Sequence, residues 1–143
     1  MKNFLTVFLL AIMMTNGYTS CEAKSSYPED STLLRYQDML ITMLSPHIDH
    51  EVGDYYSKLL TVTPSIYPYE VEIKKIERIG GFRTFDFSLT IEVVPVVGPH
   101  ISVGKDRLTF RITPEIPSNQ VRLLDYEHLE THELPSKWQH IIR

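Results

Sequence analysis

The feature that most constrains the fold of this chain is a strict alternation of apolar and polar residues between positions 85 and 93. The apolar positions are Phe85, Phe87, Leu89, Ile91 and Val93. Because successive side chains of a strand point to opposite faces, this pattern predicts an antiparallel strand with one buried and one solvated face. The buried face requires a second layer of structure to cover it.

That layer is predicted upstream, where apolar residues recur at three- and four-residue steps after the helix-capping side chains of residues 30–32. The set comprises Leu33, Leu34, Met39, Leu40, Met43, Leu44, Ile48, Val52, Tyr55, Tyr56 and Leu59. This spacing predicts an amphipathic helix. Since proline lacks a backbone N–H and clashes with the preceding turn, we expect the helix to be kinked or split at Pro46, in two pieces over 31–44 and 46–60 that share one apolar face.

A further strand is predicted on each side of the first. Residues 69–79 alternate and lead into Gly80 and Gly81, a pair that tolerates the positive φ angles of a tight hairpin turn. Residues 107–112 alternate after a loop that carries glycine and proline. These three strands form a meander.

The end of the chain predicts a fourth strand over 121–130, in which the apolar positions change face between Leu123 and Leu124, as a β-bulge would cause. The tail over 134–142 is expected to form a short last helix or to dock Trp138. We therefore predict an α+β fold in which the N-terminal helix packs on a curved antiparallel sheet of about four strands, by analogy a cystatin-like or related roll. Such folds serve inhibitors, enzymes and binding modules alike, so the fold does not choose a function.

Residues 1–23 have the pattern of a secretory signal peptide, with Lys2, an apolar run over 4–14 and a small residue at Ala23. The run of 11 residues is shorter than the roughly 20 that span a bilayer as a helix. We therefore expect cleavage between Ala23 and Lys24, a secreted or extracytoplasmic protein, and no transmembrane segment in the mature chain. The alternative is a membrane-attached lipoprotein modified at Cys21.

The expected mature chain starts with a flexible leader over 24–30, followed by a single globular domain over 31–143. It contains no cysteine, so its core must hold it together without disulfides. Removing residues 1–23 takes away one Lys and one Glu, so the formal charge stays at −4. This balance argues against nucleic acid as a partner, because binding a phosphate backbone requires a dominant basic surface.

Several segments resemble a family of small exported proteins of unknown function from Gram-positive spore-forming bacteria. They are Tyr69-Glu70-Val71, the run from Arg78 to Phe85, Val97-Gly98-Pro99-His100 and the run from Gly104 to Phe110, preceded by Leu44-Ser45-Pro46. The resemblance covers about residues 32–130. It implies export and a single domain, and it brings no reaction, ligand or partner.

Two groups of polar residues are candidates for a site. The first is the loop between the second and third strands, with His100, Ser102, Lys105 and Arg107 as candidate ligand contacts. The second is a set of potential zinc ligands, which needs the fold to bring two segments together. Its members are His47, His50, Glu51, His128 and His132.

The functional expectation is a small exported non-enzymatic module that binds a protein, a peptide or a cell-envelope component, without a cofactor. The first alternative is a metal-binding protein or metal-dependent enzyme that uses the helix histidines. The second is a structural or accessory protein without a ligand. No motif in the sequence decides between these three.

Overall fold

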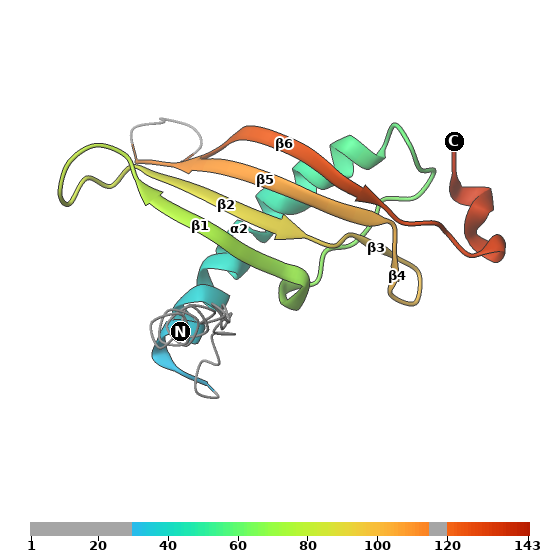
Figure 1. The fold of residues 1–143 in the computed structure, drawn as a ribbon, viewed down its shortest axis with the longest axis horizontal. Coiled ribbons are helices and arrows are strands. Elements are labelled where there is room, and N and C mark those ends of the chain that lie inside the picture. Colours follow the sequence, from blue (N-terminus) through green and yellow to red (C-terminus); the bar gives the residue numbers. More distant parts are fainter. Residues whose placement is uncertain (1–29, 115–119) are drawn as a thin grey trace, which may run out of the picture. The chain divides into compact units, whose positions relative to one another are not determined.

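A long helix packs on one face of a four-stranded antiparallel sheet (Figure 1). This computed structural model describes residues 30–114 and 120–143, and Thr32–Arg143 form one compact unit. The predicted signal peptide, the cleavage site at Ala23 and Lys24, the alternative lipidation site Cys21 and all of the leader except Asp30 lie outside the described residues.

The elements in chain order are α2 (Thr32–Tyr56), η2 (Pro68–Glu70), β1 (Val71–Arg78), β2 (Phe87–Val93), β3 (Val96–Val97), β4 (Ile101–Ser102), β5 (Gly104–Ile112), β6 (Val121–Thr131) and η3 (Ser136–Ile141). The predicted helix, four strands and last short helix follow each other in the predicted order, and η2, β3 and β4 are additional elements. The α+β class is thereby confirmed, and the comparison with a cystatin-like roll stays a prediction. None of the helices in the described ranges is long and apolar enough to cross a membrane.

The sheet has the strand order β1-β2-β5-β6, and every neighbouring pair is antiparallel. The short hairpin β3-β4 is inserted between β2 and β5, in the segment predicted as a loop. In the β5–β6 pairing, Thr109 lies opposite Asp125 and Phe110 lies opposite Leu123, which leaves Leu124 as the extra residue. The predicted bulge is therefore confirmed at its position.

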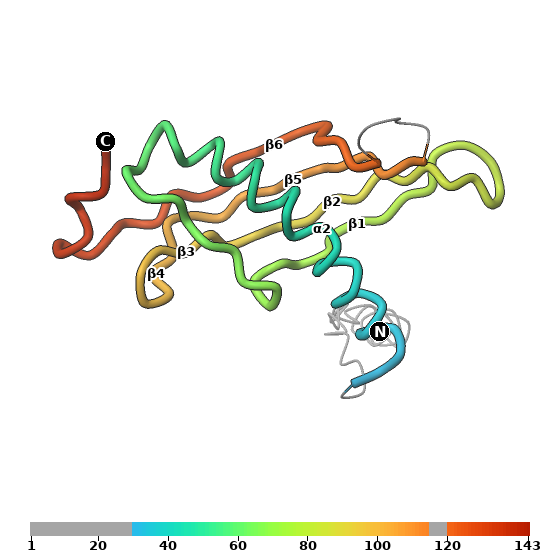
Figure 2. Tube along the Cα trace, turned by 180° about the vertical axis from the view of Figure 1, so that it is seen from behind, coloured from blue at the N-terminus to red at the C-terminus, as the bar shows by residue number. Residues whose placement is uncertain are grey.

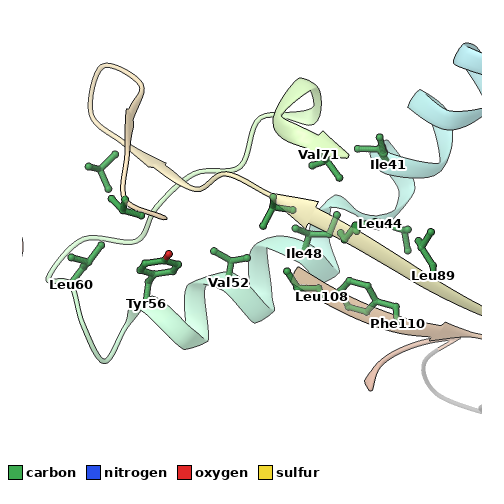
Figure 3. Close-up of a cluster of buried hydrophobic side chains, with 14 of the residues drawn as sticks. Ile41, Leu44, Ile48, Val52, Tyr56, Leu60, Val71, Leu89, Leu108 and Phe110 are labelled. Carbon is green, nitrogen blue, oxygen red and sulfur yellow. The ribbon is translucent and has the colours of Figure 1, made fainter. Parts of the chain in front are cut away.

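The core lies between α2 and the inner face of the sheet (Figure 3). The helix contributes one buried stripe at steps of three and four residues, consisting of Ile41, Leu44, Ile48, Val52 and Tyr56. The sheet contributes the alternating positions Leu89, Ile91, Val93, Leu108 and Phe110. Each of these large side chains contributes roughly 1.5–3 kcal/mol by leaving water, so this stripe and this alternation position the helix on the sheet.

The predicted split of the helix at Pro46 is wrong, because α2 runs through Pro46 without interruption. The buried stripe continues on both sides of the proline, and this tertiary packing offsets the hydrogen bond that Pro46 does not make. The prediction that all apolar residues share one face is also wrong. Leu33, Met39 and Met43 are exposed, because one helix face meets the sheet and the N-terminal turns of α2 lie beyond β1 (Figure 2).

The turn between β1 and β2 is longer than the predicted two-residue hairpin. β1 ends at Arg78 and β2 begins at Phe87, so residues 79–86 form the connection. Gly80 adopts a positive φ of 89°, as its sequence context suggested, but Gly81 does not. The apolar alternation therefore starts at Phe87, and Phe85 lies in the loop with an exposed ring.

After β6, the C-terminal segment forms the short helix η3. Trp138 is half-buried and packs on Gly98, in the turn between β3 and β4. Gly98 has a φ of 51°, and a Cβ there would lie 2.2 Å from the Trp138 ring. A short bridge between Leu60 and Ile142 joins the tail to the segment after α2. Both alternatives predicted for the tail are thus present together.

Candidate functional site

A cleft of about 520 Å³ is lined by residues from the end of α2, the end of β6 and η3, together with the segments that adjoin them. Its walls are mainly apolar and come from segments far apart in the sequence. The lining residues are Tyr56, Lys58, Leu59, Leu60, Val103, His128, Thr131, His132, Glu133, Leu134, Gln139, Ile142 and Arg143. Clefts that hold small molecules in proteins span about 300–1,000 Å³ and combine apolar walls with a few polar groups.

A fully buried carboxylate, Asp106, lies behind one wall of this cleft. Alternation along β5 places it on the inner face with Leu108. The Tyr56 hydroxyl donates a hydrogen bond to Asp106 Oδ2 at 3.0 Å, and His128 Nδ1 lies 2.6 Å from Oδ1. The approach of Tyr56 depends on Gly104, since a Cβ there would lie 2.6 Å from the Tyr56 oxygen. Burying a carboxylate is unfavourable unless such partners satisfy it.

Asp106 orients the imidazole of His128. When Nδ1–H donates to the carboxylate, Nε2 is left as an acceptor, and the Thr131 hydroxyl lies 2.7 Å from it. The ring of Tyr55 stacks on the imidazole with centroids 5.4 Å apart. The result is a carboxylate–imidazole–hydroxyl chain, and its last two members line the cleft.

Two tyrosines enclose this chain of groups. Burial, and then the negative charge of Asp106, raise the pKa of Tyr56 and the pKa of Tyr126 above the ordinary range, so both stay protonated. Tyr126 stacks on Tyr55 with centroids 4.7 Å apart. Its hydroxyl oxygen is buried near Asp106 but closes no hydrogen bond of normal geometry within the described residues.

A second chain of polar groups includes His132, which lines the cleft. The Ser102 oxygen lies 2.5 Å from His132 Nδ1, and His132 Nε2 lies 3.4 Å from Glu130 Oε2. Ser102 also donates to the Gly104 carbonyl at 3.3 Å. These contacts connect β4 to the end of β6.

The profile of a family described as a protein of unknown function, DUF3888, matches residues 36–130. The chain belongs to this family. The match confirms the predicted membership of a family of unknown function, over nearly the predicted range. No curated protein and no solved structure matches the chain. The DUF3888 range includes Asp106 and His128 and ends just before Thr131.

The structure distributes the four loop candidates of this DUF3888 protein over three places. Ser102 contacts His132, one of the residues that line the cleft. His100 lies in the β3–β4 turn with a φ of 59°, where its ring stacks on Tyr67 at 4.5 Å and meets the Tyr69 hydroxyl at 3.3 Å. Lys105 and Arg107 lie on the outer face of the sheet, so the four residues do not form one surface.

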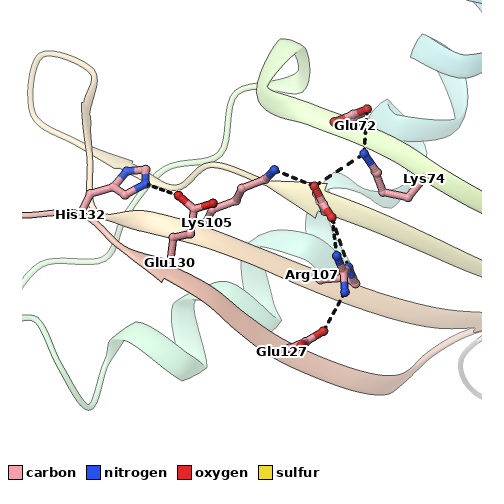
Figure 4. Close-up of polar contacts among 8 residues, drawn as sticks. Glu72, Lys74, Lys105, Arg107, Glu127, Glu130 and His132 are labelled. Carbon is pink, nitrogen blue, oxygen red and sulfur yellow. Dashed lines mark hydrogen bonds and ion pairs between the residues drawn. The ribbon is translucent and has the colours of Figure 1, made fainter. Parts of the chain in front are cut away.

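On that outer face, Glu92 organises a network of ion pairs across the strands (Figure 4). Its carboxylate is only 5% exposed, and it lies 2.7 Å from Lys105 Nζ and 2.8 Å from an Arg107 nitrogen. Hydrogen bonds from Lys105 and Arg107 lower the pKa of Glu92 to about 2. Arg107 also bonds Glu127 at 2.9 Å, and Lys74 bonds Glu72 at 3.1 Å. The cations predicted to contact a ligand are thus engaged within the sheet.

The predicted zinc ligands are not brought together either. His47 and Glu51 are half-buried and His50 is exposed, all on α2, whereas His128 bonds Asp106 and His132 bonds Ser102. Across residues 30–114 and 120–143, no three His, Cys, Asp or Glu side chains are grouped as a metal site requires. The residues that fix the orientation of the His128 ring were not predicted from the sequence. A signal was present, because Asp106 occupies the same face of its strand as the apolar residues Leu108 and Phe110.

Proposed function

We propose that this DUF3888 protein is a small exported non-enzymatic binding module of the Gram-positive cell envelope or extracellular space, and that the cleft at the end of α2 holds its ligand. The observation that carries the proposal is the cleft itself, with about 520 Å³ and mainly apolar walls. Export and setting rest on the pattern of residues 1–23 and on the family resemblance.

The lining favours an amphipathic anion. Leu59, Leu60 and Ile142 are among the side chains that would contact an apolar chain of the ligand. Among the Lys, Arg, Asp and Glu side chains of the lining, the cations of Lys58 and Arg143 outnumber the single carboxylate of Glu133. A ligand with an acyl chain and an acidic head group matches both properties.

Titration calorimetry with dodecanoate, dodecanol and dodecylamine tests this proposal. We expect saturable binding of dodecanoate, about tenfold tighter than dodecanol because charged groups strengthen the hydrogen bonds of the head group, and no binding of dodecylamine. Leu59→Glu places a charge in the wall and should abolish binding. Leu124→Glu changes an equally exposed leucine outside the cleft and is the matched control. Absence of saturable binding by all three compounds would refute the proposal.

A second candidate function, ester hydrolysis, is favoured by the chain Asp106–His128–Thr131. In that reaction the Thr131 oxygen forms a bond to the carbonyl carbon while His128 Nε2 takes the hydroxyl proton. The proton then passes to the leaving alcohol as its C–O bond breaks, and water releases the acyl group in the same way. Hydrolysis of 4-nitrophenyl butyrate that Thr131→Ser retains and Thr131→Val loses would establish this function. Equal background rates in both variants would exclude it.

A further inference from the structure

The loop of residues 79–86, between β1 and β2, presents large apolar side chains to solvent. Phe82 is 95% exposed, Phe85 is 65% exposed and Ile79 is 39% exposed. We call this segment the hairpin tip. It lies at the opposite end of the sheet from η3 and the cleft (Figure 1). Soluble proteins seldom gather exposed aromatic side chains in this way unless the patch meets a partner or a membrane.

The hairpin tip is built to hold these rings outward. Ile79 N–H donates to the Asp86 carbonyl at 2.8 Å, which closes the loop at its base. The Thr84 hydroxyl bonds the Ile79 carbonyl at 2.6 Å and the Gly81 carbonyl at 3.0 Å. Arg83 adopts a φ of 62°, next to Phe82. These hydrogen bonds hold the backbone of the loop in one conformation. The rings are therefore exposed without a further loss of conformational entropy in the loop.

Basic side chains accompany the rings. Arg78 is fixed at the base of the tip, where it donates to the Thr84 carbonyl and stacks over the Phe87 ring at 4.6 Å. Arg83 lies within the tip, and Arg122 lies at the same end of the sheet, because it pairs in register with Arg111.

The nearby acidic side chains are already engaged. Asp86 is held by Arg111 through two hydrogen bonds of 2.9 and 2.6 Å, and Glu77 pairs with Lys75 at 2.9 Å. Within the described part of the chain, the charge left over at this end of the sheet is positive, although the whole chain has a net charge of −4.

We infer that the hairpin tip is a docking site for an anionic lipid bilayer. Phe82 and Phe85 enter the boundary between head groups and acyl chains, while Arg83 and Arg122 contact lipid phosphates. An anionic membrane has negatively charged head groups above a hydrocarbon layer. Exposed aromatic rings with basic side chains around them are complementary to both layers. This inference uses residues outside the cleft and stands independently of the proposed ligand.

Vesicle co-sedimentation tests the inference on the protein recovered after export, with every variant recovered in the same way. All variants share one N-terminal sequence, so differences between them report the hairpin tip alone. We expect binding to vesicles of phosphatidylglycerol and phosphatidylcholine in equal parts, weaker binding at high salt, and little binding to phosphatidylcholine alone. The double variant Phe82→Ser and Phe85→Ser should bind at least tenfold more weakly.

Separate variants test the contribution of the basic side chains and the location of the binding surface. Arg83→Gln and Arg122→Gln should each weaken binding about fivefold, since a basic residue near an anionic surface contributes about 1 kcal/mol. The matched control replaces Met39 and Met43, two exposed apolar side chains of α2, by serine and should bind like the parent. Leu59→Glu in the cleft should also leave vesicle binding unchanged.

Three results would overturn the inference: no binding by the parent protein, equal binding by the Phe82→Ser and Phe85→Ser variant, or an equal loss in the Met39 and Met43 control. Absence of vesicle binding, with self-association in sedimentation velocity that the phenylalanine variant loses, would instead assign the hairpin tip to a second copy of the chain.

Discussion

The buried carboxylate of Glu92 gives the sharpest prediction about stability. Its pKa is lowered from the usual 4.5 to about 2 by hydrogen bonds from Lys105 and Arg107. A group whose pKa is depressed in the folded state stabilises that state above its unfolded pKa, and the contribution is lost as pH falls through the folded pKa. Glu92 therefore contributes its full stabilisation above about pH 4.5 and loses it between there and about pH 2.

The size follows from the two pKa values. The gap between 4.5 and about 2 corresponds to about 3 kcal/mol at most. Lys105 and Arg107 are 32% and 40% exposed, so solvent screening reduces the contribution to about 1–2 kcal/mol. The variant Glu92→Gln keeps the shape of the side chain and removes its charge. We expect it to lower the free energy of unfolding by about 1–2 kcal/mol at pH 7, and by much less at pH 2.5.

Urea denaturation of the parent and the variant from pH 7 to pH 2.5 measures this difference in the free energy of unfolding. The other carboxylates are present in both proteins, so their contributions cancel in the difference. Glu127→Gln is the matched control, because it bonds the same Arg107 from an exposed position, and it should change stability by less than about 0.5 kcal/mol. A Glu92→Gln difference that stays constant across this pH range would refute the assignment of its stabilising role to charge.

Five further substitutions test particular contacts. Gly98→Ala should cost at least about 2 kcal/mol in thermal denaturation, because the new methyl group meets the indole and φ is positive, whereas Gly81→Ala, with no atom within 4 Å, should stay within about 0.5 kcal/mol. Tyr56→Phe removes a hydrogen bond to a buried carboxylate and should cost about 1–3 kcal/mol, but Tyr126→Phe should be neutral or stabilising in the same urea assay. Pro46→Ala should raise stability by about 1–3 kcal/mol, since it restores a helical hydrogen bond at an exposed position, and unchanged melting would contradict this.

Local patterns predicted much of the architecture. Alternation in β2 and β5 identified the inward residues Leu89, Ile91, Leu108 and Phe110, and the change of face at Leu124 located the bulge in β6. These features depend on neighbours close in the sequence or on the two-residue period of a strand, which sequence displays directly. The same reasoning favoured two helical pieces at Pro46, whereas α2 is continuous there because packing against the sheet outweighs the local preference of proline.

The candidate site depends on long-range contacts that no local pattern reports. Asp106 and Tyr56 are 50 positions apart, and Ser102 and His132 are 30 apart. The spacing of the histidines along the chain predicts shared helix faces, but it does not predict which strand faces which helix. A bulge also sets the position of His128, because the register between β5 and β6 shifts after Lys105.

The ion pairs on the outer face of the sheet make the two ends of the sheet the better candidates for binding surfaces. Open antiparallel faces often bind ligands, and Lys105 and Arg107 were predicted to do so. In the structure both cations neutralise Glu92, so a ligand there would have to compete with a buried carboxylate and break bonds as short as 2.7 Å. The apolar walls of the cleft and the exposed rings of the hairpin tip can be covered without breaking an ion pair of their own, and they gain by leaving water. Loss of ligand binding in Leu59→Glu and loss of vesicle binding in the Phe82 and Phe85 variant, each without effect on the other assay, would show two separate surfaces at the two ends of one sheet.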